Sequence, residues 1–269
     1  MTAVADEVAR LADRLWVAGR QRTTIEPIGD EIAASGDDLV ATAYEIQQHN
    51  VDRRVRDEGA RVCGRKIGLT SVAVQRQLGV DQPDFGALWA DRCHGDGETI
   101  PWDVLSLARV EAEVALVLGD DLDLGTHAVT DVVSAVSYAV PALEIVGTRI
   151  ADWKISLGDS IADNASGDRF VVGLRPVALA DLDLAAIEMS MTVDGSIVSS
   201  GRGADCMGNP LFAARWLADT MSARGTPLRA GDVVLTGALG PMHTLTPGAS
   251  VHADLGALGS VSCEIGAAS

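Results

Sequence analysis

Three glutamates interrupt apolar segments of this chain where Val, Leu or Ala would be expected. Glu111 and Glu113 lie within the run Val110–Leu118, and Glu144 lies within Val140–Val146. Residues two apart on a strand point to the same face, so Glu111 and Glu113 are expected to lie side by side. Close carboxylates repel one another, and burying them without a partner is costly. A cation held among them would remove both problems.

Carboxylate oxygens suit a hard divalent ion such as Mg²⁺ or Mn²⁺. The pattern therefore favours a metal-dependent enzyme with Glu111, Glu113 and Glu144 as metal ligands. The alternative is a solvated strand face, with Glu111 and Glu113 in water and Ala112 and Val114 toward the core, which strict alternation also allows. Glu144 disfavours this alternative because it interrupts a second apolar segment.

Size and charge restrict the class of protein. The 269 residues fit one large domain, or one domain with a smaller N-terminal lobe. A formal net charge of −17 disfavours binding to nucleic acid or to an anionic membrane. We find no signal peptide, no apolar run long enough to cross a bilayer and no C-x-x-C pair among the four cysteines. A cytoplasmic protein with reduced thiols is expected.

The order of predicted elements indicates an α+β fold. Helical spacing predicts helices over 4–18 and 38–57, joined by a polar connection over 21–36, and these form a helical N-terminal lobe over residues 1–60. Short β-branched runs follow, with predicted strands at 61–67, 109–118, 138–146, 169–173, 187–193, 197–200, 232–236, 250–254 and 260–265. Further helices are predicted over 129–136 and from Asn209 to Gly225. This order predicts a mixed, largely antiparallel core and no nucleotide-binding βαβ units.

Lys66 and Asp84 are candidate reactive groups. Lys66 lies in an apolar, glycine-rich stretch, where a buried ammonium needs an anionic partner such as Asp84, a substrate carboxylate or an enolate. The alternative is a surface lysine with a snorkelling side chain. Asp84 lies in the turn-like segment 82–86, and an aspartate there could simply bind its own backbone.

Two loops are candidate binding segments. Residues 163–168 form a polar loop before a predicted strand, and residues 236–242 form a glycine-containing loop whose N–H groups could meet a carboxylate. Both could also be ordinary connections. The five histidines show no ligand spacing, and no G-x-S-x-G motif is present, so nucleophilic hydrolysis has no support.

Several collinear stretches together resemble one family. They are Gly64–Thr70 (GRKIGLT), Gln75–Gly86 (QRQLGVDQPDFG), Val110–Glu113 (VEAE), Pro141–Gly147 (PALEIVG), Ala162–Ser166 (ADNAS), Ser199–Gly203 (SSGRG) and Leu235–Met242 (LTGALGPM). This ordered set, within about residues 60 to 265, resembles the 2-hydroxypenta-2,4-dienoate (2-keto-4-pentenoate) hydratases of the fumarylacetoacetase superfamily.

The resemblance implies a fumarylacetoacetase-like core over residues 61–269 and homo-oligomers. It implies that Glu111, Glu113 and Glu144 bind Mg²⁺ or Mn²⁺ and that Lys66 and Asp84 act in the substrate pocket. The substrate contacts that we expect, from the resemblance and from the two loops, are Asn164, Ser166, Thr236, Gly237, Ala238 and Leu239.

The activity implied is a hydro-lyase reaction in the meta-cleavage catabolism of aromatic compounds, which adds water to a 2-hydroxy-2,4-dienoate and yields a 4-hydroxy-2-oxo acid. Lys66 would stabilise an enolate or move a proton, and Asp84 would orient water or serve as acid and base. Rival interpretations are a 4-oxalocrotonate-type decarboxylase, an acylpyruvate C–C hydrolase and a non-catalytic partner in a complex. Association with a downstream aldolase or a decarboxylase is a further expectation.

Overall fold

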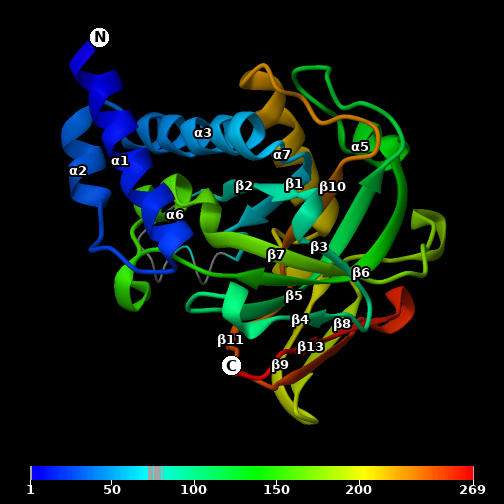
Figure 1. The fold of residues 1–269 in the computed structure, drawn as a ribbon. Helices are drawn as coiled ribbons and strands as arrows, with labels where there is room; N and C mark the ends of the chain where they lie inside the picture. The colour runs from blue at the N-terminus through cyan, green and yellow to red at the C-terminus, as the bar shows by residue number, and fades with distance from the viewer. Residues whose placement is uncertain (1, 72–74, 76–79, 81, 269) are drawn as a thin grey trace.

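Two β-sheets and a set of helices packed beside them make up the computed structural model of this chain, which describes residues 2–71, 75, 80 and 82–268 (Figure 1). The helices are α1 (Thr2–Gln21), α2 (Gly29–Ser35), α3 (Leu39–Glu58), α5 (Val129–Ala135), α6 (Leu157–Ala162) and α7 (Pro210–Ala223). None of the helices in the described ranges is long and apolar enough to cross a membrane.

The larger sheet has the strand order β2-β1-β10-β5-β6-β7-β3, and β11 pairs with β5. Its strands are β1 (Val62–Gly68), β2 (Asp84–Trp89), β3 (Cys93–Gly95), β5 (Arg109–Leu118), β6 (Val136–Val146), β7 (Gly167–Val172), β10 (Val233–Ala238) and β11 (His243–Thr244). The smaller sheet has the order β4-β13-β12-β8-β9. Its strands are β4 (Thr99–Ile100), β8 (Glu188–Val193), β9 (Ser196–Arg202), β12 (Ser250–Asp254) and β13 (Ser260–Ile265).

Local sequence explains the ends of the long N-terminal helix α3. The Asp38 side chain caps its first turn by accepting a hydrogen bond from the Ala41 N–H at 3.0 Å. Gly59 ends the helix in a left-handed conformation with φ 64°, which glycine adopts without a Cβ clash. From α3, the buried Gln47 amide donates to the backbone oxygens of Phe85 and Ile161, at 2.9 and 2.8 Å. These hydrogen bonds attach the N-terminal helices to α6 and to β2, which lies at one end of the strand order of the large sheet.

The predicted α+β class is confirmed, and so are most of the predicted strands. The segments 109–118, 250–254 and 260–265 form strands with the expected bounds. Most neighbouring strands are antiparallel, while β1–β10, β3–β7 and β4–β13 are parallel. Strands of the smaller sheet alternate between buried and more exposed residues, whereas β5 and β6 are buried over consecutive residues and are recognised as apolar runs. The boundary at residue 60 coincides with the change from α3 to β1, and the division into two domains stays a prediction.

Three expectations about local structure were wrong. The polar connection 21–36 contains the helix α2, whose Ile32 is fully buried against the neighbouring helices. Asp84 does not lie in a turn but begins β2, opposite Gly68 on β1. Residues 157–162 form α6, although no helix was expected there. Part of the family-like stretch 75–86 lies outside the described residues.

Gly64 in β1 allows a close approach between β1 and β10. Its φ is +154°, and a Cβ at this position would lie 1.9 Å from the backbone oxygen of Val233. We predict that Gly64→Ala lowers the free energy of unfolding by about 3 kcal/mol, because backbone must shift to admit the methyl group. Urea unfolding of the two proteins measures this difference.

Gly19→Ala is the matched control, since a Cβ at Gly19 would meet only Arg149 carbons at 3.8 and 3.9 Å. A Gly64→Ala protein as stable as the control would contradict the proposed close packing of β1 on β10.

Candidate metal centre and active site

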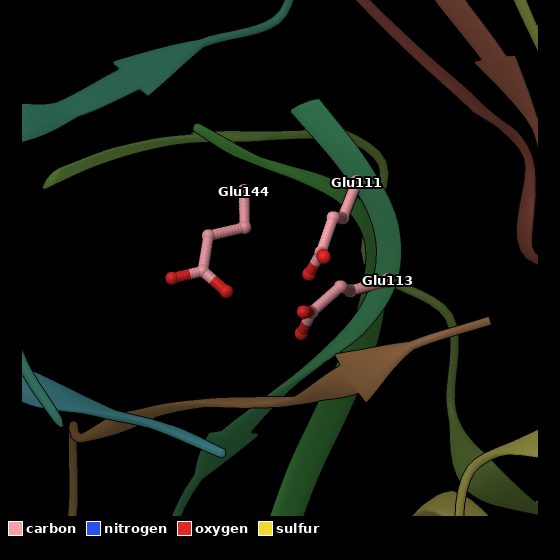
Figure 2. A group of neighbouring side chains, drawn as sticks. All are labelled: Glu111, Glu113 and Glu144. Carbon is pink, nitrogen blue, oxygen red and sulfur yellow. The ribbon is translucent and has the colours of Figure 1, made fainter. Parts of the chain in front are cut away.

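The pairing of β5 with β6 brings the three glutamates together. Glu111 and Glu144 are directly opposite one another in the antiparallel register, and Glu113 is two residues further along β5 on the same face. Figure 2 shows the three carboxylates converging, two from β5 and one from β6. One oxygen from each residue lies within 4.8 Å of the others. The arrangement that the strand pattern predicted is therefore present.

The chemistry of these oxygens fits a metal ion. Glu113 and Glu144 are 0% and 1% exposed, and Glu111 is only partly exposed. Among the described residues, Glu113 Oε1 and both oxygens of Glu144 are buried without a hydrogen-bond partner. Buried polar atoms are normally satisfied, so unpaired carboxylate oxygens aimed at one point call for a cation. Three carboxylates form a donor set that suits a hard divalent ion.

The electrostatics of the cluster agree with this conclusion. Burial, followed by repulsion from Glu144, raises the pKa of Glu111 to about 7. Burial and the charges of Glu144 and Glu111 raise the pKa of Glu113 well above its ordinary value. Burial also raises the pKa of Glu144, although Lys66 opposes this shift. The cluster resists ionisation unless positive charge is supplied.

Lys66 supplies one positive charge. It lies on β1, is 3% exposed, and its Nζ is 3.3 Å from Glu144 Oε1. The geometry is that of an ion pair rather than of a well-directed hydrogen bond. Burial lowers the pKa of this lysine, but Glu144, Asp84 and the β5 glutamates outweigh burial and raise the pKa above its ordinary value. Lys66 is therefore a buried ammonium, and the surface alternative is wrong.

Asp84 faces the same space from β2. Its Oδ2 accepts a hydrogen bond of 2.6 Å from the Ser160 hydroxyl, while its Oδ1 is buried without a partner. Burial raises the pKa of Asp84, and Lys66 and Ser160 oppose the shift. Gly68 makes room for this carboxylate, since a Cβ there would lie 2.2 Å from Asp84 Oδ1 and 3.3 Å from Lys66 Nζ. Asp84 therefore presents one bound and one free oxygen beside the lysine.

Sequence reasoning missed Ser160, which holds Asp84 in place. Ser160 lies in α6, and a signal for this helix was present in the sequence. Ser156 and Asp159 form a capping box, in which the Asp159 N–H donates to Ser156 Oγ at 3.2 Å and the Ser156 N–H donates to Asp159 at 2.9 Å. Reading that S-x-x-D pattern would have located the helix and the serine that follows it.

The end of β10 lies against the glutamate cluster. Residues 236–238, which were expected in a loop, belong to this strand. The Gly237 N–H donates to Glu113 Oε2 at 2.8 Å and so orients this carboxylate. Thr236 is fully buried and donates from its hydroxyl to the backbone oxygen of Val114. Leu239 is fully buried in the core. All three residues thus support the fold around the glutamates, and the expected substrate contacts of Thr236, Gly237, Ala238 and Leu239 stay predictions.

Asn164 and Ser166 lie on the short 3-10 helix η4 (Asn164–Ser166), next to the site. The Asn164 side chain bonds to the backbone of Ala87 on β2, accepting at 2.7 Å and donating at 3.1 Å. A Cβ on the next glycine, Gly167, would be 3.4 Å from both Asn164 Nδ2 and Glu144 Oε1. Ser166 Oγ is buried without a partner. Asn164 thus positions the segment, and the substrate contacts expected of Asn164 and Ser166 stay predictions.

A histidine–carboxylate pair is present, but it cannot activate water. His127 Nδ1 lies 2.8 Å from Asp219 Oδ1, and His127 Nε2 accepts a 3.2 Å hydrogen bond from the Leu124 N–H. Both ring nitrogens are occupied and the imidazole is buried. The pair therefore joins the loop before α5 to α7, and it gives no support to a C–C hydrolase.

Comparison with known proteins agrees with the fold and the site. The family described as "Fumarylacetoacetate (FAA) hydrolase C-terminal" matches residues 65–266, and the chain belongs to this family of enzymes. A 2-keto-4-pentenoate hydratase of Burkholderia vietnamiensis (strain G4 / LMG 22486) is 53% identical over 95% of this chain and 96% of its own length. A 2-keto-4-pentenoate hydratase of Paraburkholderia phymatum is 50% identical over the same shares of the two chains.

A solved structure is similar over nearly the whole chain. The 4-oxalocrotonate decarboxylase from Pseudomonas putida G7, complexed with magnesium and adipate, has a TM-score of 0.90 and 30% identity over 97% of this chain and 98% of its own. The expected membership of the fumarylacetoacetase superfamily is confirmed.

The raised pKa of Glu111 predicts how stability depends on pH without metal. A carboxylate whose pKa rises from 4.5 to about 7 on folding favours the folded state below pH 4.5, and this contribution is lost as pH rises through about 7. We predict that chelator-treated protein loses on the order of 2 kcal/mol of stability between pH 5 and 8 from this group. This free energy is smaller than the full pKa shift implies, because Glu111 is partly exposed to solvent.

Denaturant unfolding of wild type and Glu111→Gln across this pH range measures the difference. Glu111→Gln should show a smaller loss of stability, whereas the exposed Glu45→Gln on α3 should follow the wild type. Identical pH profiles for wild type and Glu111→Gln would contradict the repulsive cluster.

Proposed function

We propose that the chain hydrates a 2-hydroxy-2,4-dienoate of the 2-oxo-4-pentenoate type, yielding a 4-hydroxy-2-oxo acid in the catabolism of aromatic compounds. Glu111, Glu113 and Glu144 hold Mg²⁺ or Mn²⁺, and Lys66 and Asp84 act on the substrate. The observation that carries the proposal is the convergence of three glutamates with unpaired oxygens beside a buried lysine and an aspartate with one free oxygen.

The reaction needs two proton transfers and the addition of one water. The dienol loses its 2-hydroxyl proton and gains a proton at C5, which gives an α,β-unsaturated 2-oxo acid. Water then adds its oxygen at C4 and a proton at C3. A bound divalent ion supplies Lewis-acid polarisation of the 2-oxygen and stabilises its negative charge. The protein must supply the groups that move these protons.

Asp84 is the proposed proton-transfer group. Its free Oδ1 can accept or donate a proton, while Ser160 holds the other oxygen and so fixes the carboxyl orientation. Burial favours the protonated form of Asp84, which matches a group that must act as an acid in ketonisation. Lys66 keeps its charge among the carboxylates and stabilises the enolate oxygen. Ser166 Oγ is the proposed hydroxyl contact to substrate.

Hydration is favoured over decarboxylation by the relatives. Two hydratases share 50% and 53% of their residues with this chain over nearly full length, whereas the decarboxylase shares 30%. The decarboxylase remains the second candidate because its structure has a TM-score of 0.90 to this one. That structure is a complex with magnesium, which supports a divalent ion at the three glutamates of this chain.

The remaining expectations concern assembly and location. We propose a homo-oligomer that works in the cytoplasm on a small-molecule dienoate, alongside an aldolase that consumes the 4-hydroxy-2-oxo acid or a decarboxylase that supplies the dienoate. The acidic surface, with its formal charge of −17, supports the absence of nucleic-acid and membrane partners.

The activity is tested by mixing purified protein, Mg²⁺ or Mn²⁺ and a 2-hydroxy-2,4-dienoate. We predict loss of the dienoate ultraviolet absorbance, formation of the 4-hydroxy-2-oxo acid and no release of CO₂ from 4-oxalocrotonate. Nuclear magnetic resonance identifies the product. Glu113→Gln should weaken metal affinity by about 100-fold or more, because it removes a direct ligand, and should abolish turnover.

The exposed Glu45→Gln is the matched control and should leave both quantities unchanged. Full metal affinity and turnover in Glu113→Gln would refute the metal centre. Rapid CO₂ release without dienoate hydration would instead favour the decarboxylase.

The two proposed reactive groups are tested separately from metal binding. Asp84→Asn should lower kcat by about 10²- to 10⁴-fold, because the free oxygen can no longer exchange a proton. Lys66→Met should also lower kcat, because the positive charge beside Glu144 is lost. Metal affinity, measured by calorimetry, should persist in Asp84→Asn. The exposed Asp103→Asn serves as control, and unchanged turnover in Asp84→Asn would remove Asp84 from the reaction.

A further inference from the structure

A cavity apart from the glutamate cluster lies between the N-terminal helices and the large sheet. Its volume is about 370 Å³, and its lining comes from α1, α3, β7, the 3-10 helix η1 (Ala90–Arg92) and the loop after β6. None of Glu111, Glu113, Glu144, Lys66 and Asp84 belongs to the lining. The cavity is therefore separate from the metal centre, and an inference from it does not depend on the proposed hydratase activity.

The lining of this cavity is strongly basic. Six arginines line it, namely Arg20, Arg22, Arg54, Arg92, Arg149 and Arg169, against three carboxylates, namely Glu58, Asp163 and Asp168. Six positive charges minus three negative charges leave a formal charge of +3. The whole chain has a formal net charge of −17, so this cavity is a local concentration of positive charge on an acidic protein.

Existing ion pairs occupy all three of the lining carboxylates. Arg149 pairs with Asp163, and Arg92 pairs with Asp168. Glu58 is shared by Arg20 and Arg54. Asp91, outside the lining, adds one contact to Arg54 at 2.6 Å. Even with this fourth carboxylate counted, the arginines outnumber their partners.

Guanidinium donors remain without acceptors. Within the described part of the chain, Arg54 Nη1 and Arg169 Nε are buried and have no hydrogen-bond partner. The Arg54 side chain is 9% exposed, so water does not replace the missing partner readily. Arg169 Nε lies 3.8 Å from Asp168, which already binds Arg92. Two different arginines of one cavity thus lack an acceptor, and this is independent of the charge count.

Mutual repulsion among these arginines supports the same conclusion. Burial, followed by the charge of Arg92, lowers the pKa of Arg54. Burial lowers the pKa of Arg169 as well, and Arg92 and Arg22 add to the shift. Arginines that repel one another around a hollow can share a bound anion, and their planar guanidinium groups match the oxygens of phosphate, sulfate or carboxylate.

We propose that this arginine-lined cavity binds a small oxyanion that carries two or more negative charges. The anion neutralises the excess positive charge and accepts hydrogen bonds from arginines of α3, β7 and the segment after α1. It thereby joins the N-terminal helices to the edge of the catalytic sheet. Tetrahedral oxyanions and dicarboxylates share this chemistry, and separate titrations distinguish them.

The test uses the metal-loaded protein at constant ionic strength, titrated calorimetrically with sulfate, phosphate or succinate against sodium chloride. We expect saturable binding of at least one dianion with a Kd of ~1 mM or tighter, and a rise of a few °C in Tm at saturation. Arg22→Gln combined with Arg169→Gln should weaken this binding by about tenfold or more, because two positive charges at the cavity are lost. Arg54 is left intact because its burial makes its replacement a risk to folding.

Arg202→Gln combined with Arg215→Gln is the control, since it removes the same charge from exposed positions outside the cavity. Absence of saturable binding, or equal weakening in the control, would overturn the proposal. Competition between the anion and the dienoate would place the anion at the metal centre and would also overturn it. A third result would also overturn the proposal: no anion binding together with a change in the sedimentation mass of the cavity variant. The arginines would then make contacts between copies of the chain.

Discussion

Repulsion among Glu111, Glu113 and Glu144 is the constraint on which the arrangement of the large sheet depends. Carboxylate oxygens within 4.8 Å of one another repel by about 3 kcal/mol per pair at an effective dielectric constant near 20. Such a cluster is tolerable only if strand pairing and a countercharge are both in place. The register of β5 with β6 sets Glu111 opposite Glu144, and a slip of one residue would send one carboxylate to the other face.

The strands around the cluster supply what the carboxylates lack. β10 lies next to β5 and contributes the Gly237 N–H to Glu113, while β1 contributes Lys66 to Glu144. Glycines create the space, since a Cβ on Gly237 would lie 2.3 Å from the Thr70 hydroxyl. One lysine against four carboxylates, when Asp84 is included, still leaves a formal charge of −3. A bound divalent cation would offset most of this negative charge.

The strands β5 and β6 and their three glutamates could be predicted, because both strands are recognisable from their sequence pattern. Short apolar, β-branched runs identified both strands, and a glutamate within such a run stands out whatever its partners are. Asp84 was harder, because Pro83 and Gly86 are residues typical of turns while pairing with β1 decides the local structure. α6 is only six residues long, so its periodicity was too short to recognise. The arginine-lined cavity could not be predicted, because its six arginines are scattered from residue 20 to residue 169 along the chain.

The short segment Asn164–Ser166 lies between the glutamate cluster and the arginine-lined cavity and has an unusual backbone conformation. Asn164, Ala165 and Ser166 all have positive φ, at 58°, 49° and 56°. Left-handed backbone in three successive non-glycine residues costs on the order of 1–3 kcal/mol each, so the surroundings must enforce it. On one side Asn164 is bound to the backbone of Ala87, and on the other Asp163 is bound to Arg149. The same hydrogen bonds and ion pair that hold this strained turn place Ser166 beside the metal centre and Asn164 in the wall of the arginine-lined cavity. The left-handed backbone of this turn is therefore held by contacts from two directions, one to β2 and one to the arginine-lined cavity.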